Sequence, residues 1–534
     1  MLIVGSVLIA LPLAACSTTR TGPVMRQGGT LYVAIDSDPV SLNPLVAGDP
    51  ASIRAYTPLF PLLYSANTDL SPGPDLATTL PTVTASGSVL TVPLRTDAKW
   101  SDGTAITADD VVYTVTTEMS PDLDTQATFN WAPLQSVVKV DAHTVKFTLA
   151  APDAAFVADH LVTPIVPQHA LAQVNVAQMS RAPFSAAPTV TGGPFRFDHH
   201  VSGQQVVLDA NPAFYRGAPH FDHVVFVVSP DPSKILNQLG SGQLSWAPAL
   251  APTAAAAAAS AAGVTLNAYP STAFVAVMFN VRPGHLFADR AVRQAFAASI
   301  DHDGVVLHAT GSAQGYPLWG DINPSSWAFN QAALTTVGRD THHARQLLSG
   351  DGWSVPSSGT ATRSGRALSA QLIVPSSDPT RAAAASLIAQ QTRDGGFNIT
   401  ATGLGDQPFD SALSNGSFDA AVVPVGTTLD PDDSAVLGSG GSANYGGYTN
   451  PQLDGLFNSE LIATASPTAN IEQVRKPIFV HIEQMVSSDQ PLYFLWAPRV
   501  FTGFNVTVGG VAGVGAQLDD DRNETFYRDW FLTG

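Results

Sequence analysis

Short stretches of alternating apolar and polar residues, and one continuous apolar run, predict β-strands along the chain. Leu31, Val33 and Ile35 alternate with other residues near the start of the folded part. The predicted strands cover 31–35, 206–208, 224–228 and the apolar run 274–280, with a hairpin over 137–149.

Apolar residues spaced three or four apart predict helices between these strands. In the longest, Val474, Ile478, Ile482 and Met485 share one face. Thr107, with an acidic residue three positions later, predicts the start of another helix through a capping box. The predicted helices are 107–119, the alanine-rich 254–262, 289–300, 341–348, 380–393 and 471–488. The mixture predicts an α/β or α+β protein with at least two lobes.

The first sixteen residues differ from the rest. Residues 2–13 are almost all apolar, and Leu-Ala-Ala then precedes Cys16, the single cysteine of the chain. About 12 apolar residues are too few for a permanent membrane span but suit a secretory signal. The segment resembles the lipobox of bacterial lipoproteins, which implies a signal peptide over 1–15, a lipid thioether on Cys16 and a flexible lipidated linker over 16–29. The alternative is a buried free thiol. No basic residue precedes Arg20, so the true start lies upstream or the start codon here is a late one.

Composition narrows the class of protein. The net charge of −18 and the pI near 4.9 argue against nucleic acid as a partner. No later stretch reaches 18 apolar residues, so we expect a globular protein tethered to a membrane surface. A single cysteine allows no intrachain disulfide. About 520 residues remain after the signal segment, which is more than one hydrophobic core usually serves, so we expect two or three lobes.

Motifs of enzymes are missing from the chain. It has no G-x-S-x-G elbow, no Walker A sequence and no G-x-G-x-x-G. The two histidines of each pair, 199–200 and 342–343, are adjacent in sequence, so their side chains point in different directions and are poorly placed to bind one metal ion. The acidic run 519–521 lacks the pattern of a calcium loop. We therefore expect no catalysis, no metal and no resident cofactor.

Seven blocks in order resemble the family 5 extracellular solute-binding proteins, the dipeptide and oligopeptide binders of ABC importers. The most specific is Asp97-Ala-Lys-Trp-Ser-Asp-Gly-Thr-Ala-Ile-Thr-Ala-Asp-Asp-Val-Val-Tyr113. The others are 28–33 with 37–44, 192–196 with 208–215, 279–280, 289–301, 424–433 and 444–450.

The resemblance implies an α/β fold of the two-lobed periplasmic-binding-protein type (type II), with the lobes joined by a hinge. Lobe I is expected over 28–270 plus 490–534, with the extra subdomain of peptide binders at about 60–190. Lobe II is expected over 271–489.

The same resemblance implies a function without catalysis. The protein would bind di- to oligopeptides between its lobes, as a monomer on the extracytoplasmic face of the membrane, and deliver them to ABC permease subunits. Heme is a second ligand to test. Carried over from the family, the ligand-binding candidates are Gly48, Asp49 and Pro50; Phe129, Asn130 and Trp131; Arg181; Ser376 and Ser377; and Gly426, Thr427 and Asp430.

One position departs from the family pattern. Where many members carry the aspartate that binds the ligand's ammonium, this chain has Thr427, and Asp430 follows three residues later. Asp430 either substitutes for that aspartate or is structural. Longer peptides, blocked peptides or a different ligand become more plausible because a threonine cannot offset a buried ammonium charge. The alternatives are an envelope lipoprotein with a regulatory or scaffold role and a hydrolase, for which the sequence offers no nucleophile–base pair.

Overall fold

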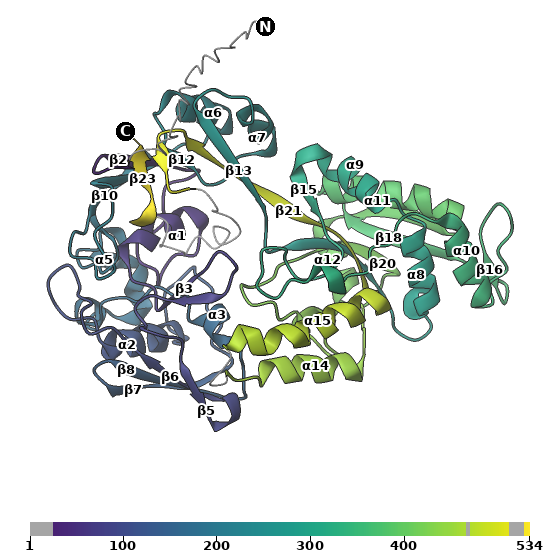
Figure 1. Cartoon of the computed structure of the whole chain (residues 1–534), viewed down its shortest axis with the longest axis horizontal. Coiled ribbons are helices and arrows are strands. Elements are labelled where there is room, and N and C mark those ends of the chain that lie inside the picture. The colour runs from purple at the N-terminus through teal and green to yellow at the C-terminus, as the bar shows by residue number, and fades with distance from the viewer. Residues whose placement is uncertain (1–24, 466–469, 512–527, 534) are drawn as a thin grey trace, which may run out of the picture.

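The chain forms two lobes that lie side by side (Figure 1). The computed structural model describes residues 25–465, 470–511 and 528–533. Lobe I denotes residues 25–270, 499–511 and 528–533, and lobe II residues 271–465 and 470–498. The expected signal peptide and the lipidation at Cys16 lie outside the described residues, and the expected domain boundaries stay predictions.

A single twelve-stranded sheet runs through both lobes. Its main path has the order β19-β18-β20-β14-β21-β12-β2-β11-β10-β9, and β13 and β15 also pair with β21. In lobe II the strands are β14 (Phe274–Phe279), β15 (Gly315–Pro317), β18 (Ser369–Pro375), β19 (Asn398–Leu404) and β20 (Ala420–Val425). In lobe I they are β2 (Thr30–Ile35), β9 (Phe195–Val201), β10 (Gln205–Ala210), β11 (His223–Val228), β12 (Trp246–Ala247) and β13 (Val264–Pro270).

The hinge consists of two crossing strands. Strand β21 (Leu492–Asn505) pairs with β14 through its first residues and with β12 and β13 through its last. Beside it, the chain passes from β13 to β14, and the backbone N–H of Ser271 donates to the carbonyl of Pro498 at 2.8 Å. Figure 1 shows β13 and β21 passing together from one lobe to the other. The lobes are therefore joined there by two passages of the chain, which are also hydrogen-bonded to each other through their main chains.

The core of lobe II lies on both faces of its half of the sheet. In β14, Val275 and Val277 pack into one cluster, while Ala276 and Met278 pack into another. This burial on both faces explains why the strand is an unbroken apolar run. The first face is covered by α8 (Arg290–Ala298), α10 (Thr341–Gly350) and α11 (Pro379–Gln391), the second by α12 (Asp406–Ser414), α14 (Pro451–Leu461) and α15 (Ile471–Asp489). Helices α9 (His302–Gln314) and α13 (Ser434–Leu437) complete the lobe.

Lobe I holds a second, smaller sheet within the expected subdomain. Its order is β5-β6-β8-β7, from β5 (Thr82–Thr84), β6 (Val89–Pro93), β7 (Leu134–Asp141) and β8 (Thr144–Leu149). Helix α2 (Ala108–Glu118) packs beside β7 and begins with the predicted capping box at Thr107. The other helices of the lobe are α1 (Pro50–Tyr56), α3 (Phe156–His160), α4 (Gln168–Leu171), α5 (Pro183–Ala186), α6 (Pro232–Ser241) and α7 (Pro252–Ala258).

Two short strand pairs lie outside these two sheets: β3 (Tyr64–Ala66) with β4 (Pro72–Pro74), and β16 (Thr362–Arg363) with β17 (Arg366–Ala367). Near the chain ends, β1 (Met25–Arg26), β22 (Val508–Gly509) and β23 (Phe531–Thr533) form a three-stranded sheet. Within the described ranges, every helix is too short or too polar to cross a membrane.

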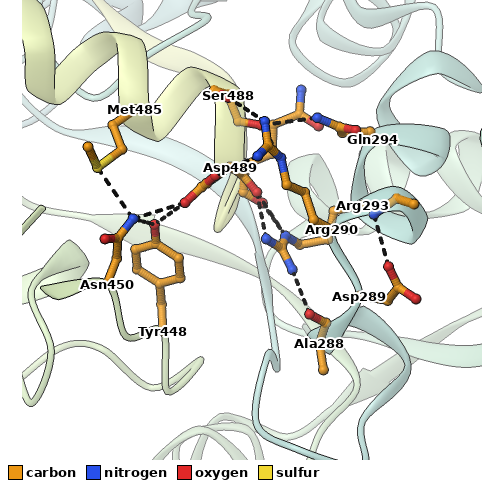
Figure 2. Close-up of polar contacts among 12 residues, drawn as sticks. Ala288, Asp289, Arg290, Arg293, Gln294, Tyr448, Asn450, Met485, Ser488 and Asp489 are labelled. Atoms are coloured by element: carbon orange, nitrogen blue, oxygen red, sulfur yellow. Dashed lines mark hydrogen bonds and ion pairs between the residues drawn. The ribbon is translucent and has the colours of Figure 1, made fainter. Parts of the chain in front are cut away.

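Two of the family-like blocks meet at the C-terminal end of α15 (Figure 2). The buried guanidinium of Arg293 donates to the main-chain carbonyls of Phe287, Asp489 and Gln490 at 2.7–3.0 Å. The Asp489 carboxylate accepts from the Tyr448 hydroxyl at 2.7 Å and from the Asn450 amide at 3.0 Å. These contacts hold the end of the helix in place within lobe II. The family-like blocks 289–301 and 444–450 therefore have a structural role.

Candidate functional site

A cavity of about 500 Å³ lies on lobe II at the end of β20. Gly426 lines it, and Pro375 at the end of β18 brings the chain to the same place just before Ser376 and Ser377. In the view of Figure 1, α12 lies on the side of lobe II toward lobe I. The remaining walls include Met278, Arg381, Asp406, Phe409, Asp410, Ala443 and Tyr445.

The two serines beside this cavity are already hydrogen-bonded within lobe II. The Ser376 hydroxyl donates to the Leu404 carbonyl at 2.9 Å, and the Ser377 hydroxyl donates to the Asp406 carboxylate at 2.5 Å. Both residues are exposed, so a ligand can reach them by exchanging these bonds. Arg381 is held by the Asp378 carboxylate at 2.7 Å.

A smaller cavity of about 190 Å³ lies on lobe I before α1. Gly48 and Phe129 both line it, so the structure brings together two predicted segments that are 80 residues apart in the chain. The loop before Phe129 is fixed by the backbone N–H of Gln126, which donates to the Val46 carbonyl at 2.7 Å. A Cβ on Gly48 would lie 3.1 Å from the Cα of Ala127, so the close approach of the two segments favours glycine. Asp49 caps α1 by accepting from the Ser52 N–H, and Pro50 is the first residue of that helix.

Three predicted ligand residues lie elsewhere. The Trp131 side chain belongs to the core of lobe I, where its indole N–H donates to Glu118 at 3.0 Å. Asn130 is exposed, and its side chain accepts from the backbone of Ala132. Arg181 is exposed at the end of a short 3-10 helix, Val176–Arg181. None of the three lines the two cavities. For Trp131 the aromatic-wall role stays a prediction, and core packing already satisfies both its ring and its N–H.

Asp430 is engaged in a buried ion pair. Both of its carboxylate oxygens accept from the Arg475 guanidinium at 2.6 Å, in bidentate geometry. The same guanidinium donates to Glu460 at 2.9 Å, and all three side chains are at most 4% exposed. Such pairing leaves Asp430 without charge to offer a ligand, so the structural alternative for this residue is favoured.

Thr427 also has a partner inside the protein. Its hydroxyl donates to the main-chain carbonyl of Thr272, at the hinge. The segment 426–430 thus connects the end of β20 to the hinge and to the buried arginine. It presents no carboxylate of its own to a ligand's ammonium.

The lobes touch at a second place, away from the hinge, which we call the basal contact. There the N–H of Ala154 donates to the Leu461 carbonyl at 2.8 Å, and the N–H of Asp430 donates to the Asp159 carboxylate at 3.2 Å. In Figure 1 the start of α15 approaches α3 at this contact.

Carboxylates crowd the basal contact. Burial, together with the neighbouring charges of Asp430 and Asp432, raises the pKa of Asp153 to about 6. Burial, opposed by Arg475, raises the pKa of Glu460 to about 9. The pKa of Asp159 is raised well above its usual range by burial and by Asp430. Among the described residues, no group of three or more His, Cys, Asp or Glu side chains is arranged to hold a metal ion.

Sequence reasoning missed Phe409 and Asp410 on α12, as well as Arg381, all of which line the lobe II cavity. Nothing in the spacing of these residues marks them, because they become neighbours only through the fold. Tyr445 could have been predicted from the sequence, since it lies in the block 444–450 that carries the resemblance.

The sequence matches a known family. The family model described as "Bacterial extracellular solute-binding proteins, family 5 Middle" matches residues 71–447. The chain belongs to family 5 of the extracellular solute-binding proteins. This confirms both the resemblance and the expected two-lobed fold.

Known proteins match this solute-binding protein in sequence and in structure over nearly its whole length. The oligopeptide-binding protein AppA of Bacillus subtilis is 25% identical over 507 residues, which cover 92% of each chain. The solved structure of that AppA with a nonapeptide superposes with a TM-score of 0.65 at 24% identity, covering 96% of this chain and 100% of the other. The unliganded open form of MppA, a periplasmic murein tripeptide binding protein, gives 0.80 at 19% identity, covering 96% and 99%.

Proposed function

We propose that this protein captures peptides between its two lobes and delivers them to the membrane subunits of an ABC importer. The family membership and the name of its AppA relative support a peptide ligand. The observation that carries the proposal is the pair of cavities, one on each lobe, beside a sheet that continues through a two-strand hinge. Bending at such a hinge brings the two cavities toward each other without breaking either core.

The ligand-binding residues proposed for lobe I are Gly48 and Phe129. Main-chain groups around Gly48 are open to a peptide backbone, and the half-buried Phe129 ring offers an apolar surface. On lobe II we propose the exposed Ser376, Ser377 and Gly426. Extended peptides bind such surfaces through main-chain hydrogen bonds, which tolerate different side chains.

The peptide's amino terminus is proposed to be held without a carboxylate from segment 426–430. Asp430 is paired with Arg475, and Thr427 is bonded to the hinge. A free and a blocked amino terminus should therefore bind almost equally well.

Calorimetry with a library of di- to nonapeptides tests the function. Saturable binding is expected for at least one length class, with less than a threefold difference between free and acetylated forms of the same peptide. Phe129→Ala should weaken binding about tenfold, the effect of losing roughly 1.4 kcal/mol of contact. Uniformly absent binding would favour the alternative of an envelope lipoprotein with a regulatory or scaffold role. Heme enters the same titrations as a second ligand.

A matched variant sharpens the role of position 427. Thr427→Asp restores the acidic residue that many family members carry there. We expect it to introduce a preference for the free amino terminus of about tenfold, while Thr427→Ser leaves the ratio unchanged. A strong preference for the free terminus already in the natural protein would contradict the proposed mode of binding.

Attachment to the extracytoplasmic face of the membrane through Cys16 completes the proposal. In cells, the natural protein should fractionate with membranes, and Cys16→Ser should release it. Mass spectrometry of the N-terminal peptide should show diacylglycerol on Cys16. Size-exclusion chromatography with light scattering tests the proposed monomer.

A further inference from the structure

A third cavity, of about 600 Å³, lies at the basal contact and is larger than either cavity described above. Residues of both lobes line it. From lobe I these come from β4, the chain through β5 and β6, and the region of α3. From lobe II they come from Trp327, Asp430, the chain just after α14 and the first turn of α15. Neither Gly48, Phe129 nor Gly426 is among its lining residues. The cavity is thus separate from the surfaces proposed for the peptide.

One part of its wall is apolar. Leu80, Val83, Leu90 and Val157 contribute from lobe I, and Ile471 from lobe II. Cavities between domains of this size, with apolar walls and a few polar groups, are the usual form of small-molecule sites.

The polar part of the wall is negatively charged. Asp153, Asp430 and Glu472 line the cavity, together with one guanidinium, Arg475. That guanidinium is engaged with Asp430 and Glu460 in the buried ion pair. Asp153 accepts from the Ala155 N–H, and within the described residues neither Asp153 nor Glu472 forms an ion pair.

The surroundings reinforce this imbalance. Burial and then the charges of Asp430 and Asp432 raise the pKa of Asp153, and burial raises the pKa of Glu472. A cation beside Asp153 would offset the repulsion from Asp430 and Asp432, and one beside Glu472 would offset that from Asp430. Among the described lining residues, an anion would find only Arg475, which is already paired.

We propose that this cavity binds an organic cation with an apolar body, of the primary-amine class, whose ammonium is held by Asp153 and Glu472. The apolar body would lie along the leucine and valine wall. Because Asp153 belongs to lobe I and Glu472 to lobe II, such a ligand favours the arrangement in which the lobes touch here. The site would act on lobe movement without contacting the peptide.

Calorimetry of the full-length protein with three probes of the same shape tests the charge requirement. Phenethylamine carries the cation, 2-phenylethanol is its neutral counterpart, and 3-phenylpropanoate is an anion. Saturable binding of the amine is expected, at least tenfold tighter than the alcohol, with none for the anion. Equal affinity for all three, or no binding of the amine, would overturn the proposal.

Substitutions locate the site. Asp153→Asn and Glu472→Gln should each weaken amine binding about tenfold, and the thermal unfolding of both variants checks that they fold. Asp410→Asn, in the lobe II cavity, is the control and should leave amine affinity unchanged. If that control loses the amine while Asp153→Asn keeps it, the amine binds with the peptide and the proposal fails. A parallel peptide titration separates this outcome from a failure of the proposed transport function.

Discussion

The two ends of helix α15 each bury an arginine, but in opposite electrostatic surroundings. At the C-terminal end, Arg293 is 5% exposed and its guanidinium donates to main-chain carbonyls. Toward the N-terminal end, Arg475 is 2% exposed and pairs with two carboxylates, while further acids surround them. One end lies inside lobe II, and the other lies at the basal contact.

The difference shows where the protein tolerates unbalanced charge. Arg293 brings one buried charge to neutral carbonyls, and Asp489, joined to Arg290 at 3.3 Å, lies beside it. At the basal contact the acids outnumber the one guanidinium, so protons or an external cation must complete the balance. The interior of lobe II is therefore fixed by its own groups, whereas the basal contact depends on conditions outside the chain.

Removing Arg475 should have the largest effect. Arg475→Gln leaves Asp430 and Glu460 buried without a cation, which typically costs about 3–5 kcal/mol of unfolding free energy. Chemical unfolding at pH 7 measures the loss. The triple variant with Asp430→Asn and Glu460→Gln should recover most of it, and no recovery would show that packing rather than charge explains the loss.

Arg293→Gln should cost less, about 2 kcal/mol, because the groups left behind are neutral carbonyls at the end of one helix. The same unfolding experiment compares it directly with Arg475→Gln. A larger loss for Arg293→Gln would reverse the comparison between the two ends of the helix.

Glu483 gives a test with pH. It faces inward from the middle of α15, and burial, followed by the charge of Asp321, raises its pKa to about 9. An unfolded glutamate ionises near pH 4.3. Since the folded state keeps the proton up to about pH 9, this residue lowers stability progressively as the pH rises between those values.

Glu483→Gln should therefore stabilise the protein by about 1–3 kcal/mol at pH 8 and change little at pH 4.5. Thermal unfolding at the two pH values measures the difference. A gain of equal size at both values would point to packing and not to ionisation.

The smallest expected effect belongs to Tyr448. Tyr448→Phe removes the hydroxyl that donates to Asp489 at 2.7 Å, and a single such hydrogen bond contributes about 1 kcal/mol. Because the Asn450 amide and Arg290 still hold Asp489, the end of α15 should stay in place. In chemical denaturation, the unfolding midpoint should fall slightly and the transition should stay as cooperative as in the natural protein.

Local patterns in the sequence were sufficient for most elements of the fold. The predicted helix 471–488 is observed at Ile471–Asp489, and the capping box at Thr107 is present as expected. Both depend on residues within four positions of one another, where propensity and periodicity act directly. The predicted hairpin over 137–149 is observed as the strand pair β7 and β8.

The site was less accessible to such reasoning. Asp430 meets Arg475 across 45 residues, and nothing in the local sequence marks that pairing. Trp131 resembles a pocket aromatic in sequence but packs into the core. Some blocks that carried the family resemblance contain residues that hold a helix end in place, as Arg293 and Tyr448 do. Similarity to the family therefore predicted structural residues better than ligand-binding residues.

Strand β21 lies in the middle of the twelve-stranded sheet, yet residues 492–505 follow every other strand of that sheet in the sequence. During translation, β14 on one side and β12 on the other wait for the same late strand. The two halves of the sheet cannot be joined until β21 has been synthesised, and pairings this distant in sequence form slowly. The two halves therefore stay unjoined until β21 has been synthesised, which would suit the export that we propose for this protein.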